Sequence, residues 1–243
     1  MAGDVRIGLI ADLHGNLFGL EAVLSELDQL GVDEIVCLGD VAVLGPRPLE
    51  VIETLRNRDI VTVCGNVDAW IGEGTSIFAD PPTSLFTKTH VAWARARLNA
   101  AQLRWLGSLP MTFEREFGDI RAVFCHGSPA SVDDIMITLS IERVGDFGHH
   151  IIVGGHSHRQ SDVQIGTVRY LNPGSAGLPG VGPGGGLPVH ERPDWIEYAV
   201  LRAGPDRIDV EMHRVRLDID RLVRDATASG MPMLSEWRML WGS

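Results

Sequence analysis

The spacing of apolar and polar residues in the first part of the chain alternates between two patterns. Short apolar runs typical of buried strands are separated by longer segments in which apolar residues recur every three or four positions, as on one face of a helix. The predicted strands span 5–11, 34–38 and 60–63, and the predicted helices span 17–30 and 48–58. Alternation of this kind indicates βαβ units and a largely parallel sheet, and therefore an α/β fold.

The pattern changes after the third predicted strand. Residues 69–82 are rich in Gly, Pro and small side chains, while 84–109 return to the helical period, so we expect a small helical cap inserted at about 69–110. We find no domain boundary and treat 1–243 as a single domain. Short β-rich segments beyond the cap predict a second sheet, with strands at 111–117, 120–125, 151–153, 161–165 and 167–171.

The last third of the chain begins with a stretch, 177–189, that is dominated by Gly and Pro. Such a composition disfavours regular structure, so we predict a surface loop and assign no binding role to its glycines. Residues 195–201 and 207–214 then predict a β-hairpin, and 218–229 predict a final helix.

Composition and charge narrow the class of protein. With 243 residues, of which 44% are hydrophobic, the chain can fill a core without disulfide bonds. Its three cysteines lie in apolar runs, which indicates reduced thiols and a cytoplasmic location: Cys37, Cys64 and Cys125. No apolar run approaches the roughly 20 residues of a membrane span. The net charge of −11 argues against extended contact with nucleic acid, although metal ions can still attract a small anion.

Five apolar runs end in side chains that can bind a metal ion. These residues are Asp12 and His14, Asp40, Asn66, His126, and the pair His156 and His158. Because the carboxyl ends of strands in an α/β sheet meet at one edge, we expect all seven side chains to converge there. Members of each pair are two positions apart, so in an extended segment they would face the same side. Imidazole and carboxylate donors together favour first-row divalent ions over calcium.

The order of these blocks resembles the calcineurin-like metallophosphoesterases, whose pattern runs D-x-H, G-D, G-N, a lone H and then G-H-x-H. Residues 39–46 and the sequence Asn172-Pro173-Gly174-Ser175 are similar to the small bacterial phosphodiesterase (YfcE-like) branch. The resemblance implies two mixed β-sheets packed face to face as a sandwich with helices outside, a four-layer α/β/β/α arrangement. It also implies two divalent metal ions, with Mn as our first expectation and Fe, Zn, Ni or Co as alternatives.

Carried over residue by residue, the resemblance implies that Asp12, His14 and His158 hold the first metal. The second metal is then held by Asn66, His126 and His156, with Asp40 bridging the two. The implied activity is hydrolysis of phosphodiester or phosphoanhydride bonds by attack of a metal-bridging hydroxide. We expect Asp40, Asn66, His126 and His14 to be catalytic. Asn66 is also expected to contact substrate, and Arg47 either contacts a second phosphate or is simply solvated.

One position departs from the family pattern. Many members have His after the Gly-Asn pair, where it is thought to protonate the leaving group or hold the phosphate, and this chain has Val67 there. Loss of a general acid typically costs about a hundredfold or more, mostly with poor leaving groups. Val67 therefore favours diesters or anhydrides over alkyl monoesters. His14, or a water held by Asp68, is a candidate substitute for the missing acid.

Several alternatives stay open from sequence. Within the enzyme class these are a hydrolase of dinucleoside polyphosphates and a phosphomonoesterase of proteins or small molecules. A non-catalytic metal-binding scaffold is a third, although none of the seven expected ligands is missing. The expected partner is a small phosphorylated substrate, with nucleotides included. Exposed apolar surface on the cap or the C-terminal hairpin would also support a homodimer. We interpret Trp93, Trp105 and the remaining histidines as packing or surface residues.

Overall fold

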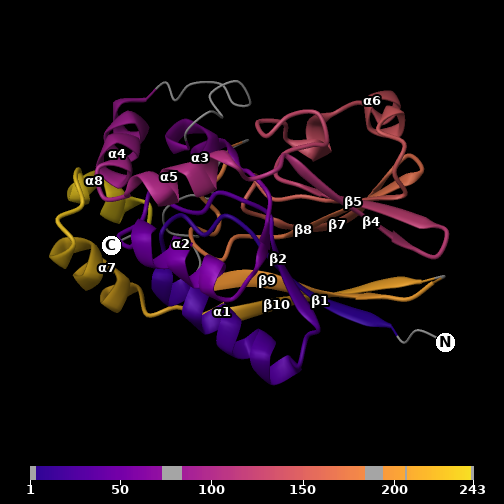
Figure 1. Ribbon diagram of the computed structural model, residues 1–243, viewed down its shortest axis with the longest axis horizontal. Helices are drawn as coiled ribbons and strands as arrows, with labels where there is room; N and C mark the ends of the chain where they lie inside the picture. Colours follow the sequence, from indigo (N-terminus) through magenta and orange to yellow (C-terminus); the bar gives the residue numbers. More distant parts are fainter. Residues whose placement is uncertain (1–3, 73–83, 184–193, 206, 242–243) are drawn as a thin grey trace.

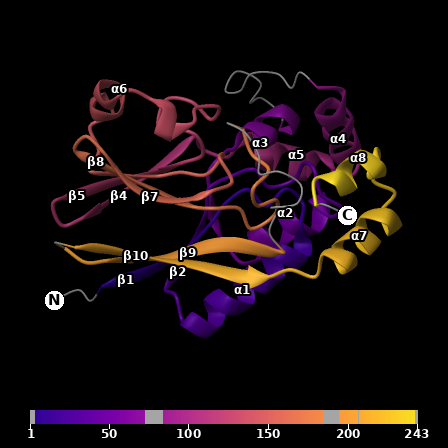
Figure 2. The same cartoon turned by 180° about the vertical axis from the view of Figure 1, so that it is seen from behind.

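Two five-stranded sheets pack face to face, and helices cover their outer sides (Figure 1). The computed structural model describes residues 4–72, 84–183, 194–205 and 207–241. Figure 2 shows the same layers from behind, with the C-terminal helices beside the helices that follow β3. The predicted fold class, an α/β sandwich of two mixed sheets flanked by helices, is confirmed.

The first sheet has the strand order β10-β9-β1-β2-β3. Its strands are β1 (Val5–Ile10), β2 (Glu34–Cys37), β3 (Val61–Thr62), β9 (Trp195–Ala203) and β10 (Ile208–Arg216). β1, β2 and β3 are parallel, as the βαβ pattern predicts, and β9 pairs antiparallel with β1. The predicted C-terminal hairpin therefore exists and extends the N-terminal sheet, a placement that the sequence pattern did not give.

The second sheet has the strand order β4-β5-β6-β8-β7. Its strands are β4 (Thr112–Phe117), β5 (Ile120–Cys125), β6 (Ile151–Val153), β7 (Gln160–Ile165) and β8 (Val168–Pro173). β5, β6 and β8 are parallel to one another, and the two edge strands run antiparallel to their neighbours. β5 and β6 thus end at the same edge, directly before the two histidine blocks.

Both faces of β1 are buried, which explains its continuous apolar sequence. Ile7 and Leu9 belong to the core between the two sheets, together with Phe124 of the second sheet. Ile10 belongs to the core between the first sheet and the helices. On this helical side Gly8 lies so close to Leu27 that an added Cβ would come within 2.9 Å of its methyl groups.

The helices form two outer layers. The layer on the first sheet contains α1 (Leu17–Leu30), α2 (Pro48–Asn57), α3 (Asn66–Ile71), α4 (Leu85–Arg95), α5 (Ala100–Gly107), α7 (Ile219–Ala228) and α8 (Leu234–Met239). On the second sheet lie the 3-10 turn η1 (Met136–Thr138) and α6 (Ile141–Asp146). The α4 side chain of Trp93 and the neighbouring Arg97 donate hydrogen bonds to the carbonyls of Gly230 and Ser229, which joins the cap to the C-terminal helices.

Several expectations about local structure need correction. Helix α3 occupies 66–71, where we expected irregular chain from residue 69, and the rest of that stretch, 73–83, lies outside the described residues. The elements η1, α6 and α8 were not predicted. The loop that we expected at the surface, 177–189, is buried over 177–180, where Gly177 packs against the backbone of Leu13. Its positions 184–189 are not described.

Cys37, Cys64 and Cys125 are all buried and unpaired. Among the described residues, no helix has the length and apolar character needed to cross a bilayer.

Candidate metal centre

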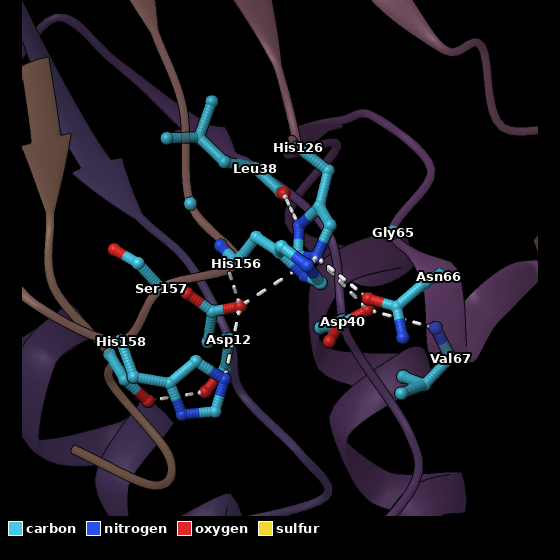
Figure 3. A network of polar contacts seen from close by, with 12 residues as sticks. Asp12, Leu38, Asp40, Gly65, Asn66, Val67, His126, His156, Ser157 and His158 are labelled. Carbon is cyan, nitrogen blue, oxygen red and sulfur yellow. Dashed lines mark hydrogen bonds and ion pairs between the residues drawn. The ribbon is translucent and has the colours of Figure 1, made fainter. Parts of the chain in front are cut away.

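All seven predicted ligands lie in the loops that leave the strands at one edge of the two sheets. The loops after β1, β2, β5 and β6 carry Asp12 and His14, Asp40, His126, and His156 and His158, while Asn66 opens helix α3. Each of the seven residues is buried. Convergence of strand ends from two different sheets therefore builds this cluster, as the order of motifs predicted (Figure 3).

The backbone at the cluster is unusual, because five of the seven residues have positive φ angles: Asp12, His14, Asp40, His156 and His158, at 46–66°. Side-chain-bearing residues adopt this left-handed region rarely and at a cost of about 1–2 kcal/mol each. The expected extended backbone was wrong for both pairs: Asp12 and His14 still face the same donor group, but His156 and His158 do not. Left-handed turns aim His156 and His158 at different ends of the cluster. Such clustered strain is typical of functional sites.

Two glycines allow the Asp40 and Asn66 loops to approach each other. Gly39 has φ +90°, and a Cβ there would lie 2.5 Å from the backbone nitrogen of Gly65. A Cβ on Gly65 would in turn lie 2.2 Å from Oδ1 of Asp40. The absence of both side chains is thus a steric requirement for the position of the Asp40 carboxylate.

The donor atoms form two groups that share Asp40. Asp12, His14, Asp40 and His158 offer atoms within 4.8 Å of one another, and so do Asp40, His126 and His156. Oδ2 of Asp40 lies 3.6 Å from Nε2 of His14, whereas its Oδ1 lies 3.4 Å from Nε2 of His126. The two carboxylate oxygens therefore face different groups, which is the arrangement of a bridging ligand.

Backbone carbonyls fix the orientation of two histidines in the first group. Nδ1 of His14 donates to the Val43 carbonyl at 2.9 Å, and Nδ1 of His158 donates to the Leu178 carbonyl at 2.7 Å. Since a carbonyl only accepts, each Nδ1 carries the proton and each neutral ring presents a lone pair at Nε2. These two Nε2 atoms are 3.0 Å apart. Two facing lone pairs favour a cation between them.

The second group shows the same chemistry. Nδ1 of His126 donates to the Leu38 carbonyl at 2.7 Å, which leaves Nε2 to face the cluster. That Nε2 lies 3.1 Å from Oδ1 of Asn66 and 3.2 Å from Nδ1 of His156 (Figure 3). A metal ion bound here would displace the proton from Nε2 of His126, and three atoms with lone pairs would then point at a common place, at the opposite end of Asp40 from His14.

Burial and charge shift the pKa values of these groups in opposite directions. Burial alone would lower the pKa of His126, but the carboxylates of Asp40 and Asp12 raise it to about 10. Burial and the charge of His126 lower the pKa of His156 to about 4. For Asp12, burial raises the pKa well above its ordinary value. The cluster thus holds more negative charge than its surroundings solvate, and positive charge stabilises it.

The donor set fits a pair of divalent ions. Oδ2 of Asp12 is buried without a hydrogen-bond partner, and an orphaned carboxylate oxygen of this kind is costly unless a cation binds it. Among the described residues, the ion pairs of Asp12 and Asp40 are with histidines. Asp12, His14, Asp40 and His158 would hold one ion, and Asp40, Asn66, His126 and His156 the other.

Asp68 does not have the role expected for it. Its side chain is fully buried, with Oδ2 accepting from the backbone N–H groups of Asp40 at 2.8 Å and Gly65 at 2.9 Å, and Oδ1 from that of Val41 at 2.9 Å. It therefore ties the Asp40 loop to the start of α3, and it is not among the described residues that line the cavity. Asp68 is the third residue after the N-cap Gly65, and its bond from the Gly65 N–H is one half of a helix capping box.

The loop after β8 supports the histidine and Asp12 loops. Nδ2 of Asn172 donates to the Gly155 carbonyl at 2.6 Å, and Oγ of Ser175 donates to the Asp12 carbonyl at 2.8 Å. The sequence Asn172-Pro173-Gly174-Ser175 thus joins β8 to the cluster through side-chain bonds to backbone.

Arg47 is the predicted substrate contact that the structure does not bring to the site. Its guanidinium pairs with Asp225 of α7 and with Glu50 at 3.2 Å. It does not line the cavity of about 450 Å³ that opens beside the ligands, whereas Asn66 does. The ion pair to Asp225 instead fixes α7 against the start of α2.

Part of the cavity lining was not predicted from sequence. Trp70 of α3, Phe86 of α4 and Leu240, which follows α8, line the cavity together with the ligands. Their apolar spacing is that of ordinary amphipathic helices, so no local signal separated them from packing residues. The tryptophans that we did consider lie elsewhere, since Trp93 contacts the end of α7 and Trp105 lies beside Ile60.

Comparisons with known proteins agree with this geometry. Residues 5–191 match the family model of the calcineurin-like phosphoesterase superfamily domain. The uncharacterized protein MJ0912 of Methanocaldococcus jannaschii is 29% identical over 157 residues, 63% of this chain and 62% of that protein. The match therefore spans less than two thirds of that relative's length.

Two solved structures are similar over nearly the whole chain. A metallophosphoesterase from Sphaerobacter thermophilus has a TM-score of 0.69 at 26% identity and covers 98% of both chains. The hypothetical protein PH1004 from Pyrococcus horikoshii has a TM-score of 0.77 at 18% identity and covers 98% of this chain and 99% of that one. The second likeness concerns the fold alone.

Proposed function

The chain belongs to the calcineurin-like phosphoesterase superfamily, and we propose that it hydrolyses phosphodiester or phosphoanhydride bonds with two divalent metal ions. The sequence resemblance to this superfamily is thereby confirmed. The observation that carries the proposal is Asp40, whose two carboxylate oxygens face the two donor groups separately. A carboxylate shared in this way suits a pair of ions around one phosphate.

The chemistry of the donors supports the choice of ion. Four imidazoles, two carboxylates and one amide oxygen suit first-row divalent ions, of which we propose Mn first and Fe, Zn, Ni or Co as alternatives. When bound, such ions would polarise phosphoryl oxygens and make a water molecule more acidic, so that hydroxide would be available to attack at neutral pH.

The protein's own contribution is to orient the donors before substrate arrives. Carbonyl acceptors at Val43, Leu38 and Leu178 hold three histidine rings, so their ligand nitrogens need no reorganisation. Asn66 lines the cavity, and we propose that its amide N–H donates to a phosphoryl oxygen while its oxygen faces His126. Fixed donors of this kind stabilise charge that grows in the transition state.

We propose that neither candidate substitute protonates the leaving group. Both ring nitrogens of His14 are engaged, one with the Val43 carbonyl and the other within the first donor group. Asp68 is occupied by three backbone N–H groups. With Val67 in the cavity wall, esters with good leaving groups are favoured, which supports diesters and anhydrides over alkyl monoesters.

The test compares three substrates with Mn²⁺ present: bis(p-nitrophenyl) phosphate, p-nitrophenyl phosphate and diadenosine tetraphosphate. We expect the aryl diester to be hydrolysed faster than the aryl monoester, and the reverse order would contradict the preference for diesters. Asp40→Ala should abolish both metal binding, measured by elemental analysis, and turnover. The exposed Asp119→Ala is the matched control and should keep both. Near-normal activity of Asp40→Ala would defeat the proposal.

We also propose a cytoplasmic location, in line with three buried, unpaired thiols. A small phosphorylated substrate, nucleotides included, is the partner we propose, and a homodimer stays a prediction.

A further inference from the structure

The cavity beside the metal centre is lined by two chemically different sets of residues. Five of the predicted ligands form one set: His14, Asp40, Asn66, His156 and His158. The other set, which we call the apolar wall, consists of Leu44, Val67, Trp70, Phe86, Val181 and Leu240. At about 450 Å³ the cavity lies within the range of about 300–1,000 Å³ typical of small-molecule sites.

The apolar wall is assembled from distant parts of the chain. Trp70 lies in α3 and Phe86 in α4, while Leu240 follows α8 at the other end of the sequence. All three are partly buried and pack against the large helical core, so they retain exposed surface that faces the cavity. A ligand that removes these exposed apolar side chains from water gains favourable binding free energy.

Among the described residues that line the cavity, the titratable side chains all belong to the ligands, and none is Lys or Arg. Thr87 and the indole N–H of Trp70 are the other polar groups of this described lining. A second phosphate or a carboxylate placed against these apolar side chains would lose hydration without gaining a cationic partner from them, which is unfavourable. The described lining therefore favours an uncharged group, and the indole and phenyl rings favour a flat one.

We propose that the apolar wall binds an uncharged aromatic ring attached to the phosphate that the metal centre holds. The ring belongs to an aryl or a nucleoside substituent, and both share the same flat, uncharged chemistry. This inference rests on the proposed function, which places the phosphate at the metal centre. It disfavours dinucleoside polyphosphates as substrates, because their further phosphates would contact the apolar wall. Trp70 and Phe86 are then residues that determine specificity.

The experiment measures binding, so it does not depend on turnover. Calorimetric titration of the Mn-loaded protein compares methylphosphonate with phenylphosphonate, whose C–P bonds resist hydrolysis, and with thymidine 5′-monophosphate. We expect phenylphosphonate to bind about tenfold or more tightly than methylphosphonate. Tighter binding of the nucleotide than of phenylphosphonate identifies a nucleoside substituent, and the reverse identifies an aryl one. A 4-carboxyl group on the phenyl ring should weaken binding.

Variants of the apolar wall test whether the preference for the ring arises at this surface. Trp70→Ala should reduce the preference for phenylphosphonate about tenfold and leave methylphosphonate affinity unchanged, and Phe86→Ala, on a different helix, should act in the same direction. Trp105→Ala removes an equally large side chain beside a different hollow and should leave the preference intact. Bound metal measured in every variant shows that the centre is preserved.

Equal affinity for the two phosphonates in the wild-type protein would overturn the inference, and so would a preference that survives in both Trp70→Ala and Phe86→Ala. Failure of the proposed function has a different signature. In that case no diester is hydrolysed by the Mn-loaded protein, whatever the phosphonates show.

Discussion

Replacement of Asp68 by Asn tests how the Asp40 loop is held. The side chain has two oxygens, and Oδ2 accepts two backbone N–H groups while Oδ1 accepts the third, from Val41. If the Asn oxygen takes the place of Oδ2, its NH₂ group faces the N–H of Val41 and that buried donor loses its partner. An unsatisfied buried donor costs about 1–3 kcal/mol, and the two remaining bonds lose charge assistance worth about 1 kcal/mol each.

Burial and, after it, the charge of Asp40 raise the pKa of Asp68 to about 7. The two buried carboxylates therefore repel each other, and the neutral Asn side chain removes this repulsion, which offsets part of the cost. We therefore expect Asp68→Asn to lower the free energy of unfolding by about 2–4 kcal/mol. For a chain of this size the melting temperature should fall by roughly 5–15 °C.

The assay is thermal and urea unfolding of chelator-treated protein, followed by circular dichroism, so that metal binding does not contribute. Asp59→Asn is the matched control, since Asp59 is exposed and its φ of 50° suits Asn equally well. It should change stability by less than about 0.5 kcal/mol. A value for Asp68→Asn within about 1 kcal/mol of wild type would refute the role of these three bonds in holding the loop.

Three further outcomes are expected. Gly65→Ala should lower the bound metal measured by elemental analysis, because its Cβ would lie 2.2 Å from Oδ1 of Asp40. The control is Gly145→Ala, in α6 with open space around it, which should raise the free energy of unfolding by about 0.5–1 kcal/mol. Arg47→Ala should lower the melting temperature by loss of its ion pair with Asp225, while KM for an aryl diester stays within about twofold. Mn²⁺ at about 100 times its Kd should raise unfolding free energy by about 2.7 kcal/mol over chelated protein, and an unchanged melting temperature would contradict metal binding to the folded state.

The sequence predicted the ligand side of the site because each ligand block has a local signal. An apolar run, a glycine and a polar residue mark a strand end such as Leu38-Gly39-Asp40, and strand ends of an α/β sheet meet at one edge. The same local reasoning failed for the backbone itself. Two residues such as His156 and His158 look like an extended pair by spacing, whereas positive φ angles send them to different donor groups.

Features that depend on contacts between distant segments were not predictable in this way. The pairing of β9 with β1 is set by the fit of two apolar faces, and hairpin periodicity does not specify the neighbouring strand. The Gly-rich segment after β8 looked solvated by composition, yet Leu178 is buried and its carbonyl orients His158. Composition indicates that such a segment lacks regular structure, but it does not determine whether the segment is exposed.

Helix α3 connects the two sets of residues that line the cavity. It begins at the ligand Asn66, carries Asp68 to the Asp40 loop, and ends one residue after Trp70 of the apolar wall. Its six residues are too few to be stable alone, so its position depends on Asp68 and on packing against α4 and α5. A ring bound against Trp70 and a metal bound by Asn66 therefore act on one rigid turn of helix. Because binding energies are linked through a shared element, an aromatic ligand that binds Trp70 should also tighten binding of the metal held by Asn66, and calorimetry should show the metal tightening the ligand by the same factor.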